Sequence, residues 1–191
     1  METLAVILGL AYLVLAIRQN PWCWPAGIAS SVLYIVLMAR ATLYMESGLQ
    51  VFYVFMGLYG WWQWVGPGRR SDGSQGRGLP VTRWSLRRQT PLMALTAILT
   101  LASGLALRQW TDAAAPFLDS FVTWGALVAT WMTARKILET WHWWLVVDSV
   151  SLALYVSREL YQTAALFAVY LVLVVVALRT WRRSVPAEAP A

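Results

Sequence analysis

Seven long apolar runs, separated by short polar or charged segments, limit what this 191-residue chain can fold into. The runs cover approximately residues 2–17, 24–44, 49–65, 91–110, 117–134, 141–157 and 161–181. Most of them approach the roughly 20 residues that a helix needs to cross a bilayer. With 59% hydrophobic and 13% charged residues, the chain has too few polar side chains to cover a soluble globule. We therefore expect an all-α membrane protein with seven transmembrane helices.

The positive charges are unevenly divided between the two sides that alternate connections would occupy. One side holds Arg18, Arg69, Arg70, Arg77, Arg83, Arg87, Arg88, Arg135, Lys136, Arg179, Arg182 and Arg183, whereas the other holds Arg40, Arg108 and Arg158. The positive-inside rule then places the N-terminus outside the cell and the C-terminus in the cytoplasm. Since these charges follow topology, we expect no nucleic-acid partner.

Two segments of the chain resemble each other. Leu33-Tyr34, Leu43-Tyr44, Tyr53 and Trp64 are matched by Leu154-Tyr155, Leu160-Tyr161, Tyr170 and Trp181. The offset is 121 residues for the first pair and 117 for the other three, which we interpret as a weak repeat with one loop shorter by four residues. Chance matches among frequent aromatic residues are the alternative.

A repeat of three helices predicts the domain organisation. We expect a first repeat over 1–65, a flexible cytoplasmic linker over 66–90, a linking transmembrane helix over 91–110, a second repeat over 117–181 and a disordered tail over 182–191. The result is a 3+1+3 arrangement of parallel repeats. Transporters built from such repeats bind their substrate near the bilayer midplane.

Polar and aromatic side chains form a stripe along three of the predicted helices. The stripes comprise Trp141, Trp144, Asp148 and Tyr155; Gln50, Tyr53, Gly57, Gly60 and Trp64; and Trp24, Gly27, Ser31 and Tyr34. Each spacing places its residues on one helical face, so the three faces could line one cavity. Indole rings would stack on a flat, especially a cationic, ring, while Gln50 and Asp148 would orient it by hydrogen bonds.

Each feature also has a structural interpretation. Asp148 could form a hydrogen bond with a Ser, Thr or Trp of a neighbouring helix, although acids inside the membrane usually mark a substrate or proton path. Gly57 and Gly60 are more typical of close helix packing than of ligand contact. Trp22, Trp143 and Trp181 suit an interfacial belt, and His142 suits the cytoplasmic interface without chemistry. The single Cys23 excludes a disulfide framework and a cysteine-based metal site.

The longest of these patterns resemble a known family. NPWCWPAGIASSVLYIVLMARATLYMESGLQVFYVFMGLYGWWQW and DSFVTWGALVATWMTARKILETWHWWLVVDSVSLALY resemble the PnuC family of bacterial vitamin transporters, whose best-known members carry nicotinamide riboside. The most specific pieces are LQVFY…YGWWQW and R-K-x-x-E-x-W-x-x-W-x-x-x-[ND], which ends at Asp148. The resemblance implies a fold similar to the SWEET sugar transporters, facilitated diffusion and a homotrimer. Several nicotinamide riboside carriers have Asn at the position of Asp148, so this chain departs from them there.

These observations predict a transporter that takes up a small-molecule vitamin, with nicotinamide riboside as the first candidate and thiamine as the alternative, because both carry a cationic ring. Lacking a P-loop, the chain would equilibrate its substrate without a cofactor, and a cytoplasmic kinase would trap the product. An intramembrane enzyme or a sensory subunit is the alternative of another class. The sequence contains neither G-x-S-x-G nor H-E-x-x-H, which disfavours an enzyme.

Overall fold

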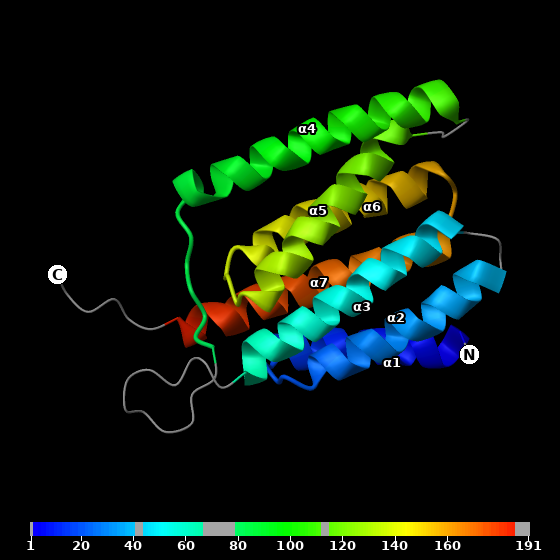
Figure 1. Ribbon diagram of the computed structural model, residues 1–191. Coiled ribbons are helices and arrows are strands. Elements are labelled where there is room, and N and C mark those ends of the chain that lie inside the picture. The colour runs from blue at the N-terminus through cyan, green and yellow to red at the C-terminus, as the bar shows by residue number, and fades with distance from the viewer. Residues whose placement is uncertain (1, 41–43, 67–78, 112–114, 186–191) are drawn as a thin grey trace, which may run out of the picture. The chain divides into compact units, whose positions relative to one another are not determined.

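The computed structural model describes residues 2–40, 44–66, 79–111 and 115–185, and within these ranges the chain forms seven α-helices (Figure 1). They are α1 (Glu2–Ile17), α2 (Cys23–Arg40), α3 (Tyr44–Val65), α4 (Leu86–Trp110), α5 (Pro116–Ala134), α6 (Thr140–Ser157) and α7 (Tyr161–Ser184). The helix number and most boundaries agree with the sequence prediction. The only β-structure among the described residues is an isolated bridge between Thr82 and Ile137.

α4 begins five residues before the predicted start at Pro91. Pro91 lies inside the helix, where the missing N–H costs one backbone hydrogen bond. Side chains hold the preceding turn in place: the Glu139 carboxylate accepts the Trp84 N–H at 2.8 Å, and the Gln89 amide donates to the Trp84 carbonyl at 3.1 Å. The Glu139 contact joins residues 55 positions apart, so it could not be predicted from the sequence around Pro91.

The predicted linker and tail are shorter than expected where the structure describes them. Leu79 and Val81 are buried, which differs from a flexible connection over 66–90. α7 continues to Ser184 and so takes up the first residues of the predicted tail. Residues 67–78 and 186–191, on which the rest of these two predictions falls, lie outside the described residues.

Two of the described helices, α4 and α7, are long and apolar enough to cross a membrane by length and composition alone. α1 and the first part of α2 form shorter apolar helices. The remaining helices contain Gln, Ser, Thr, Trp and Tyr side chains, which lower their hydropathy. Seven transmembrane helices are therefore expected from the number and spacing of the apolar runs, since by itself neither α3, α5 nor α6 is apolar enough to predict a span.

The chain divides into two compact units. The first contains Met1–Val81, Ala134–Lys136 and Arg183–Ala191, and the second contains Thr82–Thr133 and Ile137–Arg182. In the first unit, α2 packs against both α1 and α3 (Figure 1). The Ser30 hydroxyl of α2 donates to the Ala5 carbonyl of α1 at 2.8 Å. A Cβ atom built on Gly57 or Gly60 of α3 would overlap Ile28 or Trp24 of α2, so these glycines permit the close approach, as predicted.

The second unit contains α4 to α7. The Trp124 indole of α5 donates to the Ser103 hydroxyl of α4 at 3.0 Å, and α5 approaches α6 where Gly125 meets Val147. α6 and α7 are joined by the perpendicular ring pair of Trp141 and Trp181, with centroids 5.2 Å apart. α6 is therefore the inner helix of this unit.

Helix boundaries recur at a spacing of 117 residues. α2 and α6 begin at Cys23 and Thr140, while α3 and α7 begin at Tyr44 and Tyr161. The offset of 121 residues between Tyr34 and Tyr155 was interpreted as a loop shorter by four residues. The helix bounds show no such shift, because α2 and α6 have equal length and begin 117 residues apart. In this register, Ser31 corresponds to Asp148.

Backbone geometry before these helices repeats as well. Gln19 and Lys136 both have left-handed backbone, with φ of 55° and 50°. Beside them, Asn20 N–H donates to the Leu15 carbonyl at 2.9 Å and Ile137 N–H donates to the Met132 carbonyl at 3.0 Å. A left-handed residue with this hydrogen bond is a common way to end a helix. The same stop signal therefore ends α1 and α5, although neither sequence contains the usual glycine.

Candidate functional site

One face of α6 brings the predicted polar and aromatic residues together. Trp141 and Asp148 are buried, whereas Trp144 and Tyr155 are half-buried. The helix runs without interruption from Thr140 to Ser157, so the spacing of these residues converts directly into a common face. This part of the predicted stripe agrees with the geometry of the second unit.

The carboxylate of Asp148 is buried without a polar partner in the described part of the chain. The residue is 4% exposed, and no hydrogen bond or ion pair from a described residue reaches its carboxylate. The structural alternative, a bond to a Ser, Thr or Trp of a neighbouring helix, therefore has no counterpart among these residues. A buried charge without compensation is costly, so the group is suited to bind something that the chain does not supply.

Ser151 extends this polar site and was missed by the sequence analysis. It lies one turn after Asp148, is 1% exposed, and its hydroxyl has no hydrogen-bond partner among the described residues. In contrast, the Ser149 hydroxyl donates to the carbonyl of Leu145 within the same helix at 2.7 Å. The i, i+3 relation to Asp148 was the available signal, but it looked like ordinary helix composition.

α7 contacts the aromatic members of the stripe. Trp181 is fully buried against Trp141, so its predicted place in an interfacial belt is wrong. Tyr155 stacks on Phe167 with a centroid distance of 5.2 Å and an interplanar angle of 24°. The Trp141 indole N–H lacks an acceptor among the described residues. α7 therefore fixes the rings at both ends of the face, and Asp148 lies between them.

The first unit contains a second tryptophan pair. Trp24 is buried edge-on against Trp64, with centroids 5.5 Å apart and planes at 88°. Tyr12, which sequence analysis did not select, contacts the same indole at 5.8 Å. Its signal was a lone aromatic hydroxyl in the otherwise aliphatic α1. The Trp24 indole N–H also lacks an acceptor within the described ranges.

The other predicted residues of the first unit lie on α2 and α3. Ser31 is buried, while Tyr34, Gln50 and Tyr53 are half-buried. The ring of Tyr53 lies edge-on to that of Phe52, with centroids 6.1 Å apart. α3 therefore combines a packing edge, at its glycines, with a half-buried polar surface.

Lys136, in the α5–α6 turn, is a buried cation in the first unit. Its Nζ lies 4.4 Å from the centroid of a Trp64 ring, and the Trp64 indole donates to the Ala134 carbonyl at 3.1 Å. Burial lowers the pKa of Lys136 from 10.5 to about 8, although the nearby Cys23 thiol acts in the opposite direction. No described carboxylate pairs with this amine. A cation–π contact therefore replaces an ion pair.

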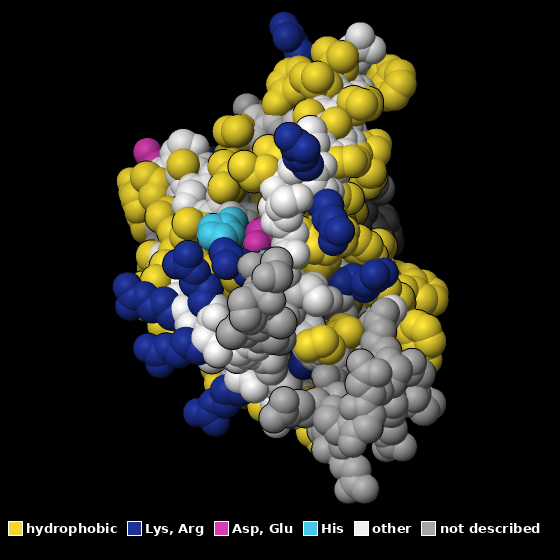
Figure 2. All heavy atoms as spheres, turned by 90° about the vertical axis from the view of Figure 1, so that its left-hand side faces the viewer, with side chains coloured by type: hydrophobic (Ala, Val, Ile, Leu, Met, Phe, Trp, Pro, Cys, Tyr) yellow, Lys and Arg dark blue, Asp and Glu magenta, His cyan; other side chains and the backbone are white. Residues whose placement is uncertain are grey.

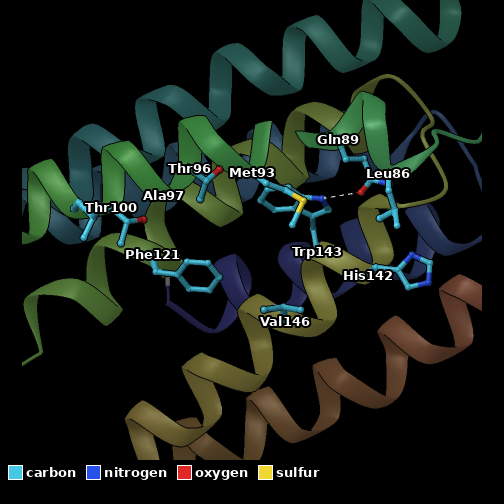
Figure 3. A pocket seen from close by; sticks show the side chains of 11 residues that line it. Leu86, Gln89, Met93, Thr96, Ala97, Thr100, Phe121, His142, Trp143 and Val146 are labelled. Carbon is cyan, nitrogen blue, oxygen red and sulfur yellow. Dashed lines mark hydrogen bonds between the residues drawn. The ribbon is translucent and has the colours of Figure 1, made fainter. Parts of the chain in front are cut away.

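A cavity of about 570 Å³ lies in the second unit among α4, α5 and α6 (Figure 3). None of the predicted substrate residues lines it. His142 and Trp143 do, and the Trp143 indole donates to the Gln89 side-chain carbonyl at 3.4 Å. Trp143 therefore has a packing role beyond the predicted interfacial one. Within the described ranges, no group of three or more His, Cys, Asp or Glu side chains could hold a metal ion.

Positive side chains gather at one end of the second unit, where α4 and α6 begin and α7 ends (Figure 2). The exposed arginines of this end are Arg83, Arg87, Arg88, Arg179 and Arg182. At the opposite end, Arg158 forms an ion pair with Asp119 at 3.1 Å. The uneven distribution of Arg and Lys that the sequence shows thus corresponds to an excess of positive charge at one end of this unit.

Comparison with known proteins relates this arrangement to membrane transporters. A family model described as "Nicotinamide mononucleotide transporter" matches residues 1–183. The chain is 29% identical to the riboflavin/roseoflavin transporter RibM of Streptomyces davaonensis, over 92% of this chain and 81% of the relative. It is 26% identical to the nicotinamide riboside transporter PnuC of Escherichia coli, over 96% of this chain and 85% of the relative.

A solved structure is similar in fold. The crystal structure of the vitamin B3 transporter PnuC matches with a TM-score of 0.73 and 19% sequence identity. The match covers 96% of this chain and 81% of the solved chain. The order of all seven helices is therefore that of a known transporter fold.

Proposed function

We propose a specific substrate and mechanism for this chain on the premise that it belongs to the nicotinamide mononucleotide transporter family. Membership confirms the resemblance that the sequence indicated and makes the chain a vitamin transporter of the PnuC family. Relatives in this family differ in the vitamin that they carry. The substrate must therefore be argued from the side chains of this protein.

Nicotinamide riboside is the substrate that the geometry supports best. The observation that carries this proposal is the buried carboxylate of Asp148, which has no partner among the described residues and lies between two ring positions on α6. A pyridinium ring offers a positive charge to the carboxylate and a flat face to Trp144. Ser151 adds a hydroxyl one helical turn away, within the same buried face.

Riboflavin is a second candidate because RibM is 29% identical to this chain. An uncharged flavin ring would stack on the same indoles but would leave Asp148 without a cation. Thiamine, with its cationic thiazolium ring, would satisfy the carboxylate and is the third vitamin to test. The negative charge on Asp148 thus favours the cationic vitamins, nicotinamide riboside and thiamine, over uncharged riboflavin.

The proposed mechanism is facilitated diffusion, with cytoplasmic phosphorylation trapping the product. We place the chain in the inner membrane, with its N-terminus outside and its C-terminus in the cytoplasm. The arginine-rich end of the second unit supports this orientation. The 3+1+3 arrangement is supported by the 117-residue recurrence of helix starts and helix stops. The homotrimer is proposed from the resemblance alone.

Uptake into liposomes tests the proposal. We expect protein-containing liposomes, but not empty ones, to equilibrate labelled nicotinamide riboside without exceeding the outside concentration. Asp148→Asn retains the size of the side chain and removes its charge, so the affinity for both cationic vitamins should fall by about 1–2 kcal/mol. Riboflavin transport, if present, should change little.

Asp119→Asn is the matched control, because it removes the same charge from a surface ion pair that contributes little. This variant should transport nicotinamide riboside, thiamine and riboflavin at rates near those of wild type. Equal transport of nicotinamide riboside by wild type and Asp148→Asn would contradict the assigned role of the carboxylate. Absence of flux for every vitamin would instead favour an intramembrane enzyme or a sensory subunit.

A further inference from the structure

The cavity of the second unit is a long apolar groove. Along α4 it is lined by Leu86, Gln89, Met93, Thr96, Ala97, Thr100 and Leu101. These residues repeat every three or four positions and span four helical turns, about 22 Å at the rise of an α-helix. Phe121 of α5 and Val146 of α6 form the facing wall (Figure 3). The groove therefore runs along a helix and suits a long, narrow ligand better than a flat ring.

Its lining is also unsuited to a polar vitamin. Most of the lining surface is apolar, and the Gln89 amide is already engaged with Trp84 and Trp143. The hydroxyls of Thr96 and Thr100 are small polar groups in this lining, without a hydrogen-bond partner among the described residues. Met93 and Leu101 remain exposed in spite of their apolar character. In a membrane protein, such a groove is complementary to an acyl chain, which gains free energy with each methylene group it buries.

Two arginines belong to the helical turn at one end of the groove, although neither lines it. Arg87 and Arg88 lie in the same helical turn as Leu86 and Gln89, and both are exposed. His142, which lines the groove, is exposed at the same end (Figure 3). The acidic residue nearby, Glu139, is buried and accepts the Trp84 N–H. The open positions at this end therefore favour an anionic group.

We propose that this groove binds an anionic phospholipid, with one acyl chain along α4 and the phosphate headgroup at Arg87 and Arg88. The combination of an apolar groove with a basic mouth is the chemistry by which pockets between membrane helices hold acidic lipids. The site is separate from the residues assigned to the vitamin and does not depend on which vitamin is carried. Its occupant is a lipid of the surrounding bilayer.

Lipid titration of the full chain tests this site. Purified protein in detergent is titrated with phosphatidylglycerol or with zwitterionic phosphatidylcholine, and retained lipid is counted by native mass spectrometry. We expect tighter binding of phosphatidylglycerol. The double variant Arg87→Gln/Arg88→Gln should weaken it roughly 30-fold, from about 1 kcal/mol for each arginine near a lipid headgroup.

Two matched controls come from α4 itself. Arg108→Gln removes an exposed charge at the other end of the helix and should leave lipid binding unchanged. Ala97→Trp fills the groove without altering charge and should abolish the retained lipid, whereas Ala94→Trp changes an exposed alanine outside the groove and should not. These substitutions affect the lipid-facing side of the helix, so each is checked for an unchanged melting profile.

Several results would overturn the proposal. Equal binding of phosphatidylglycerol and phosphatidylcholine would contradict the headgroup site at Arg87 and Arg88. A loss of lipid binding in Arg108→Gln as large as in the double variant would contradict it too. Retained lipid in Ala97→Trp would remove the acyl-chain site. A change of oligomeric state in Ala97→Trp, without a change in lipid binding, would show that the groove receives a second copy of the chain instead.

Discussion

At the scale of single residues, Asp148 shows how far a local sequence pattern can lead. An acid in an apolar run predicts a functional position, because its insertion into a bilayer costs about 2.5–3.5 kcal/mol. The structure adds that the carboxylate is buried without a described partner and that Ser151 accompanies it. The spacing of Ser151 from Asp148 was too weak a signal to select it, since a helical serine can equally donate to the carbonyl four residues earlier.

Lys136 makes a prediction about pH. Because burial lowers its pKa to about 8, the folded protein binds fewer protons than the unfolded protein between pH 8 and 10.5. Stability should therefore rise with pH across this window, whereas below it the cost of burying the charge is fully present. Melting temperatures of purified wild type and Lys136→Met, measured from pH 7 to 10, check this. The rise should be smaller in the variant, and parallel curves would contradict it.

At the scale of helices, boundaries were predicted best where the cause was local. Polar residues and prolines between apolar runs place the ends of α1, α3, α5 and α6 within one or two residues, apart from the start of α3. The predicted start of α4 was wrong because a distant carboxylate, that of Glu139, and the amide of Gln89 in α4 itself both hold Trp84 just before the helix. The role of Trp181 was also wrong, since periodicity cannot distinguish burial against Trp141 from a place at the interface.

The packing of α3 on α2 makes a prediction about stability. Gly60→Ala places a methyl group against the Trp24 ring and should destabilise the protein by about 1–3 kcal/mol. Gly48→Ala, on the same helix with nothing within 4 Å of the added Cβ, should be neutral or slightly stabilising. Thermal melting of the two variants compares them. Equal melting temperatures would show that the α2–α3 contact can widen without cost.

At the scale of the whole molecule, the sequence predicted seven helices and the family, because long apolar runs and dense aromatic motifs are local signals. It predicted the composition of the candidate site only in part. Trp141 and Asp148 are buried on one face, but Tyr12 and Ser151 were found only from contacts and burial. Periodicity identifies the face of a helix, whereas the partner of that face depends on packing between helices.

Orientation in the membrane makes a prediction at this scale. Ser85 and Thr111 flank α4 and are both exposed, so cysteine at either position can report the side that it faces. An impermeant maleimide should label Thr111→Cys in intact cells and Ser85→Cys only after permeabilisation. Wild type, whose Cys23 is buried, supplies the background. The reverse pattern would invert the proposed topology.

The correspondence between Ser31 and Asp148 bears on how such a protein could arise. If a gene encoding three helices was duplicated and fused, both positions began as the same residue in identical halves. The tryptophan pairs are alike in both units, because a change in either ring would disturb its perpendicular neighbour. The hydroxyl in one half and the carboxylate in the other have diverged. The same spacing of 117 residues pairs Tyr34 with Ser151, which differ as well, so after such a duplication each half would have acquired polar groups of its own.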